Sequence, residues 1–120
     1  MINSYRELTV WQKSIELVTE IYNLTNTFPK SELFGITNQM RRAVVSIPSN
    51  IAEGYVRKHR PEYLQFLRVA FGSGAELETQ IIIAKKLKLS QVDDFKKSES
   101  LLEEVMKMLN KMISSLEASP

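Results

Sequence analysis

Apolar residues along this chain recur every three or four positions, which is the spacing of one face of an α-helix. Four such stretches predict amphipathic helices at about residues 9–27, 32–53, 61–88 and 91–116. The strict alternation of apolar and polar residues that marks a half-buried strand is not found. Because the connections between the stretches are short, the sequence predicts an all-α fold, an up-down-up-down antiparallel four-helix bundle.

Residues at the ends of the predicted helices favour the same helix boundaries. Thr9 and Gln12 have the spacing of a capping box at the start of the first helix. Pro29 follows that helix, and the residue before a proline is pushed out of the helical region. Gly54 stands where a helix often ends in a left-handed residue, and Pro61 suits the first turn of the third helix.

A proline interrupts the apolar stripe of the second helix. Pro48 has no backbone N–H, and its ring crowds the carbonyl of Val44. Two outcomes stay open: a kink near residues 44–47, or a restart with Ser46 as a new N-cap. The second helix is therefore predicted to be kinked or restarted near Pro48.

The third helix has a glycine-rich middle at residues 70–75. No strand precedes it, and its spacing is not that of a phosphate-binding loop. We expect Gly72 and Gly74 to let a neighbouring helix approach closely, at a propensity cost of ~1 kcal/mol per glycine.

Composition limits the classes of function. The 120 residues, 43% of them hydrophobic, predict one domain over residues 1–120. No run of about 18 apolar residues is present, and the first residues lack an apolar signal core, so we expect a cytoplasmic protein without a membrane contact. Cysteine is absent and His59 is the one histidine, so we expect no disulfide, metal or cofactor.

Catalytic arrangements are not indicated. Nucleophilic catalysis needs a base and a group that orients it, whereas His59 lies among cations that oppose its protonation. Glu76 and Glu78 are two residues apart and point in different directions on a helix. Glu76 with Ser73 fits a buried polar contact between helices, or a contact across a subunit boundary. We expect no catalytic residue and no enzymatic activity.

Charge is unevenly distributed. The formal net charge is only +2, but residues 33–61 carry five cations against the single acid Glu53, a local net charge of +4. This asymmetry indicates a local anionic partner. Guanidinium groups beside tyrosines suit phosphate contacts and base stacking. The predicted nucleic-acid-binding residues are Arg41, Arg42, Tyr55, Arg57, Lys58 and Arg60.

The two adjacent arginines are expected to play different parts. Arg41 and Arg42 diverge by about 100° around a helix, so one can stay near the core edge while the other faces solvent. The alternative to RNA contact is a solvated loop, with arginines that pair with Glu32, Glu53 or a neighbouring subunit.

Several stretches resemble one known family, and the resemblance runs from about Leu8 to Leu89. They are Leu8-Thr-Val-Trp-Gln-Lys13, Gln39-x-Arg41-Arg42-Ala43, Ser46-Ile-Pro-x-Asn-Ile-Ala-Glu-Gly54 and Gly72-Ser73-x-x-Glu76-Leu77-Glu78-Thr79-Gln80. The chain resembles the four-helix-bundle proteins encoded by intervening sequences within 23S rRNA genes. The same fold family includes the accessory variability determinant of diversity-generating retroelements. His59-Arg60-Pro61 departs from the family, in which a small capping residue often precedes the third helix.

The resemblance implies a homopentameric ring with a basic surface, a role linked to nucleic acid and no catalytic site. Contact with structured RNA, either rRNA or a retroelement transcript, is therefore one hypothesis. The other is a structural adaptor without RNA affinity, which docks a partner protein such as a reverse transcriptase. Five apolar residues belong to none of the core stripes: Phe34, Val45, Val56, Ile82 and Ile83. Exposed apolar residues mark interfaces, so these five could serve either partner docking or self-association.

Overall fold

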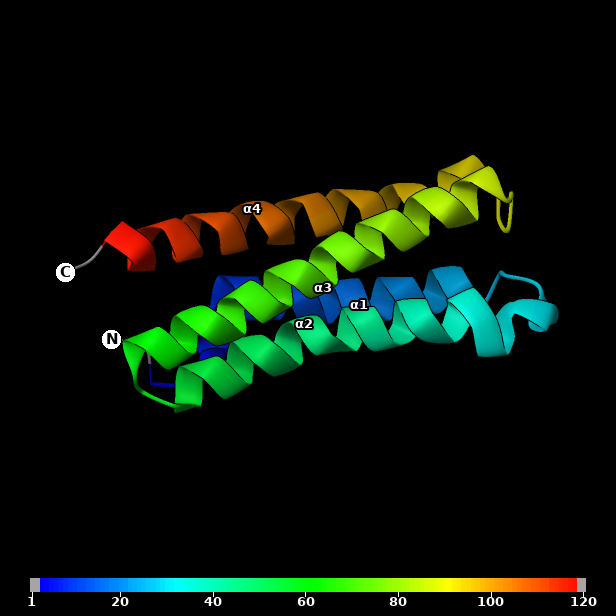
Figure 1. Ribbon diagram of the computed structural model, residues 1–120. Coiled ribbons are helices and arrows are strands. Elements are labelled where there is room, and N and C mark those ends of the chain that lie inside the picture. The colour runs from blue at the N-terminus through cyan, green and yellow to red at the C-terminus, as the bar shows by residue number, and fades with distance from the viewer. Residues whose placement is uncertain (1–2, 119–120) are drawn as a thin grey trace.

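Four long helices form the protein in the computed structural model, which describes residues 3–118. They are α1 (Thr9–Thr25), α2 (Asn38–Val56), α3 (Arg60–Lys86) and α4 (Lys96–Ala118), and no strand occurs within the described residues. Successive helices run antiparallel, and α4 packs back onto α1, which closes the bundle (Figure 1). The molecule is a rod of 48 × 22 × 21 Å. The predicted all-α four-helix bundle is confirmed.

The core is a continuous apolar column to which every helix contributes. Its largest fully buried side chains include Leu17, Ile21, Met40, Ile47, Ile51, Leu67, Leu77, Phe95, Val105 and Leu109. Burying each such side chain stabilises the fold by about 1.5–3 kcal/mol before the entropy of ordering the chain is subtracted. Between residues 3 and 118, no helix is both long enough and apolar enough to span a membrane.

The first helix begins at Thr9, as predicted, but its cap and its end differ from the prediction. The Thr9–Gln12 capping box is wrong, because α1 follows Leu8 without a side-chain cap and Gln12 Nε2 instead donates to the Arg6 carbonyl at 2.8 Å. The helix also ends at Thr25, well before Pro29, because the N–H groups of the next residues turn back onto its last carbonyls.

The second helix begins later than residue 32. Residues 30–37 form a 3-10 turn (Lys30–Glu32) and a π-helical turn (Leu33–Thr37), in which Gly35 leaves helical geometry at φ −108°, ψ −117°. The restart near Pro48 is wrong, because α2 is continuous from Asn38 to Val56. Beside the proline, Asn50 Nδ2 donates to the Ser46 carbonyl at 2.8 Å and to Ser46 Oγ at 2.9 Å. The break in helical geometry therefore lies at Gly35.

Glycines set how closely the helices approach. The left-handed helix end predicted at Gly54 is wrong: this residue is buried inside α2, and a Cβ there would lie 2.6 Å from the Phe66 Cβ of α3. A Cβ at Gly74 would collide with the Met106 sulfur of α4, whereas one at Gly72 would meet nothing within 4 Å. The prediction that a glycine lets a neighbouring helix approach is thus confirmed at Gly74 and wrong at Gly72. Gly54 has this role as well.

Alanine substitutions should separate these roles. Gly54→Ala is expected to lower the free energy of unfolding by about 1–3 kcal/mol, because the Phe66 Cβ cannot move without its backbone. Gly72→Ala, the matched control in open space, should raise it by up to about 1 kcal/mol through helix propensity. Urea unfolding measures both, and equal effects would contradict this account.

Candidate nucleic-acid interface

The six predicted binding residues fall into two groups on the structure. Arg41 and Arg42 lie near the start of α2, whereas Tyr55, Arg57, Lys58 and Arg60 lie at its end and in the turn that leads to α3. Because a helix rises 1.5 Å per residue, Arg42 and Arg57 are about 22 Å apart along the axis. The residues therefore do not form one patch on a single chain.

Arg41 holds two helices together. Its Nε donates to Thr25 Oγ1 at 2.9 Å and its Nη2 to Asn26 Oδ1 at 3.0 Å, both at the end of α1. Its guanidinium carbon also lies 4.6 Å from the centroid of the Tyr22 ring. By contrast, Arg42 is exposed and forms no ion pair with any residue of the described chain. The predicted divergence of the two arginines is confirmed.

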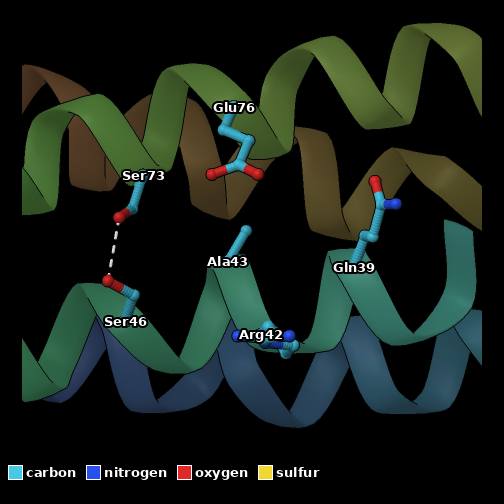
Figure 2. Close-up of a pocket in the computed structure, with 6 residues that line it drawn as sticks. All are labelled: Gln39, Arg42, Ala43, Ser46, Ser73 and Glu76. Atoms are coloured by element: carbon cyan, nitrogen blue, oxygen red, sulfur yellow. Dashed lines mark hydrogen bonds between the residues drawn. The ribbon is translucent and has the colours of Figure 1, made fainter.

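A polar cleft of about 300 Å³ separates α2 from α3, and Figure 2 shows the side chains that line it. Ser46 and Ser73 face each other across it, with their hydroxyl oxygens 2.9 Å apart. Glu76 accepts from Gln80 Nε2 at 3.4 Å and is exposed. Of the two alternatives for Glu76, the buried contact with Ser73 is therefore not formed, and the contact across a subunit boundary stays a prediction. Ser73 instead joins the Asn50–Ser46 pair in tying α2 to α3.

A second cavity, of about 430 Å³, lies at the α2–α3 turn, and we name it the turn hollow. It is lined by Tyr55, Lys58, His59, Arg60, Tyr63 and Leu116. The Tyr55 and Tyr63 rings are nearly perpendicular, with an interplanar angle of 86° and centroids 6.0 Å apart. Burial raises the pKa of Tyr63, and the neighbouring Tyr55 raises it further. The Tyr63 phenol is therefore neutral at physiological pH.

Exposed basic side chains line this hollow beside the two tyrosines. Lys58, His59 and Arg60 are exposed, and none has an ion-pair partner among residues 3–118. Lys58 adopts φ 53°, the left-handed conformation that reverses the chain between α2 and α3. Its neighbour Arg57 differs, because its Nη2 lies 3.2 Å from Glu53 Oε2 and its guanidinium packs 5.2 Å from the Phe66 ring centroid. The alternative of pairing with Glu53 thus holds for Arg57.

Sequence reasoning missed part of this hollow. His59 is not among the predicted binding residues, although it lies between the predicted cations Lys58 and Arg60. Leu116 comes from the far end of the chain, and no local pattern links it to the turn. Tyr63 is not among the predicted binding residues; its position two residues after Pro61, in the first turn of α3, was the available signal.

The arrangement suits binding of a planar or anionic group. Along residues 3–118, no three His, Asp or Glu side chains gather where they could hold a metal ion. Instead, the cationic side chains can attract phosphates, and the aromatic rings can stack on flat groups.

Fold and site together define an all-α four-helix bundle with a cationic, aromatic turn. The chain belongs to the family described as "23S rRNA-intervening sequence protein", whose family model matches residues 6–111. A similar solved structure is a protein of unknown function from the S23 ribosomal protein family of Bacteroides thetaiotaomicron VPI-5482. The TM-score is 0.80 at 23% sequence identity, over 88% of this chain and 95% of that one, so the likeness concerns the fold. No curated protein matches the chain.

Single alanine substitutions should separate the two adjacent arginines. Arg41→Ala is expected to lower the free energy of unfolding by about 1–2 kcal/mol, because it removes the contacts to Thr25, Asn26 and Tyr22. Arg42→Ala, its matched control, should change it by no more than about 0.5 kcal/mol. Urea unfolding provides the comparison. A destabilised Arg42→Ala beside an unchanged Arg41→Ala would reverse the assignment.

Proposed function

We propose that this protein binds structured RNA, either rRNA or a retroelement transcript, through the α2–α3 turn. The observation that carries the proposal is the group Lys58, His59 and Arg60, which is exposed, lines an aromatic hollow and forms no ion pair with residues 3–118. RNA presents phosphates to such cations and bases to such rings. The family description, which names 23S rRNA, gives the proposal further support.

Electrostatics determine how strong such binding is. Each cation that neutralises a phosphate releases counterions, and this release drives association. The two cations Lys58 and Arg60 of one turn give modest affinity. We therefore propose that the protein self-associates and repeats the turn around a ring; five subunits are what the sequence resemblance implies. Arg42 would add a second cationic position on each subunit, about 22 Å from the turn.

Removing the cations at the turn should weaken RNA binding. We expect the Lys58→Gln and Arg60→Gln double variant to bind a labelled rRNA fragment less tightly. The slope of log affinity against log salt should fall by about 1.4–1.8, because two fewer phosphates are neutralised per site. Fluorescence anisotropy across a salt series measures both quantities.

The chain offers a matched control at the opposite end of the bundle. Lys86 and Lys88 are also exposed and without an ion-pair partner in residues 3–118, and Lys88 is left-handed at φ 55°, as Lys58 is at φ 53°. The Lys86→Gln and Lys88→Gln variant therefore loses the same charge and tests the same backbone strain. Equal loss of affinity in both double variants would show that net charge matters and the turn does not.

A second candidate function, that of an adaptor for a partner protein such as a reverse transcriptase, fits a separate observation. All five apolar residues left over from the core stripes are exposed: Phe34 93%, Val45 41%, Val56 56%, Ile82 50% and Ile83 42%. An apolar side chain as exposed as Phe34 contributes little to the fold and suits an interface. Self-association and partner docking both fit this observation. A protein complex that is insensitive to salt, without RNA affinity, would favour the adaptor.

Substitution of Phe34 tests whether this residue serves an interface. Phe34→Ser should leave the free energy of unfolding within about 0.5 kcal/mol, because the ring is almost fully exposed. It should lower the assembly mass measured by light scattering if Phe34 joins subunits. Leu17→Ser, at a fully buried position, is the contrasting control and should unfold the protein. An unchanged mass would exclude Phe34 from the contact between subunits.

A further inference from the structure

The turn hollow has more apolar surface than phosphate binding requires. Cations alone suffice to hold a sugar–phosphate backbone, and such contacts carry no information about bases. Here, however, the lining combines Lys58, His59 and Arg60, which we call the rim, with Tyr55, Tyr63 and Leu116, which we call the floor. An apolar floor inside a cationic rim fits a ligand that is flat and apolar on its faces and anionic beside them.

We propose that the turn hollow binds an unpaired nucleobase, so that the RNA is single-stranded or looped where it meets the protein. This inference rests on the proposed function, because it specifies which part of the RNA binds at the α2–α3 turn. A base has two apolar faces for the floor, and its own phosphate lies within reach of side chains as long as those of Lys58 and Arg60.

The geometry of the tyrosine pair supports stacking. At an interplanar angle of 86°, the edge of one ring meets the face of the other. The ring that contributes its edge therefore does not have its faces covered by its partner. Leu116, from the last turns of α4, adds an apolar wall beside the rings. Base stacking on an aromatic side chain contributes about 1–3 kcal/mol per base and tolerates any sequence.

Duplex RNA fits this hollow less well than unpaired RNA. In an A-form helix the bases are stacked on each other, and the deep, narrow major groove does not admit side chains. A duplex would engage only Lys58, His59 and Arg60 and leave the floor empty. Unpaired bases in loops, bulges and ends can turn outward onto aromatic rings. The combination of rim and floor therefore favours unpaired RNA over duplex.

The experiment uses 2-aminopurine, a fluorescent base whose emission falls when it stacks on an aromatic ring. Two hairpin RNAs of identical sequence and length carry the probe, one in a loop of uridines and the other in the stem. On titration with the full-length protein, we expect quenching of the loop probe and none of the stem probe. A blunt duplex of the same length should bind more weakly than the loop hairpin in anisotropy.

Tyrosine variants test the floor directly. Tyr55→Leu and Tyr63→Leu keep an apolar side chain but remove the ring, and we expect them together to weaken binding of the loop hairpin at least about fivefold and abolish the quench. Tyr55→Phe and Tyr63→Phe, the matched controls, keep both rings and should bind nearly as the wild type does. Duplex binding should be the same in all of these proteins. The quench with wild-type protein needs no variant, so it decides the question even where a leucine variant fails to fold.

The outcomes separate this inference from the proposed function. If neither hairpin nor duplex binds at low salt, both are wrong. If loop and duplex bind equally, without a quench, while Lys58→Gln with Arg60→Gln still weakens binding, RNA contact stands and base capture is overturned. A quench that persists in the leucine variants also overturns it, because the base would then stack elsewhere.

Discussion

Helices α2 and α3 approach so closely near the turn that position 54 has no room for a side chain. The Phe66 Cβ occupies the space that a Cβ on Gly54 would need, and further along the same interface Ser46 and Ser73 hydrogen-bond across it. This contact brings the end of α2 and the start of α3 within reach of a three-residue connection, residues 57–59. Such a tight reversal needs a left-handed residue, which is Lys58. The hollow and its cations exist because these two helices are held this close.

Periodicity predicted the fold because each helix buries one long apolar stripe, and a stripe of that length leaves few arrangements besides a bundle. It also identified the side chains left outside, since all five residues assigned to no stripe are exposed. Local signals were less reliable at the ends of helices. Gly54 has the position of a helix cap, yet its role is set by Phe66 of α3, which the local sequence does not reveal. The non-helical backbone angles lie at Gly35, where no local signal predicted them, whereas α2 continues through Pro48 without a restart.

The candidate site was predictable in its charges and not in its geometry. A cationic stretch is visible in the sequence, but whether a given arginine is available depends on what the tertiary fold places beside it. Arg41 hydrogen-bonds to residues at the end of α1, and Arg57 pairs with Glu53, one helical turn earlier. Lys58 and Arg60 are exposed to solvent. Only the i to i+4 pair of Glu53 and Arg57 can be inferred from spacing along the chain. Within residues 3–118, the cations that stay available are those that the bundle does not use for its own cohesion.

The antiparallel arrangement also places the start of α1 and the end of α4 near the turn hollow. Because four helices return the chain to its starting end, α1 begins and α4 ends beside the α2–α3 turn (Figure 1). Leu116 lines the hollow and lies two residues before the end of α4. An affinity tag or fused domain at either terminus would therefore compete with a ligand for access. An immobilisation point in the α3–α4 connection, at the far end of a rod 48 Å long, leaves the hollow open.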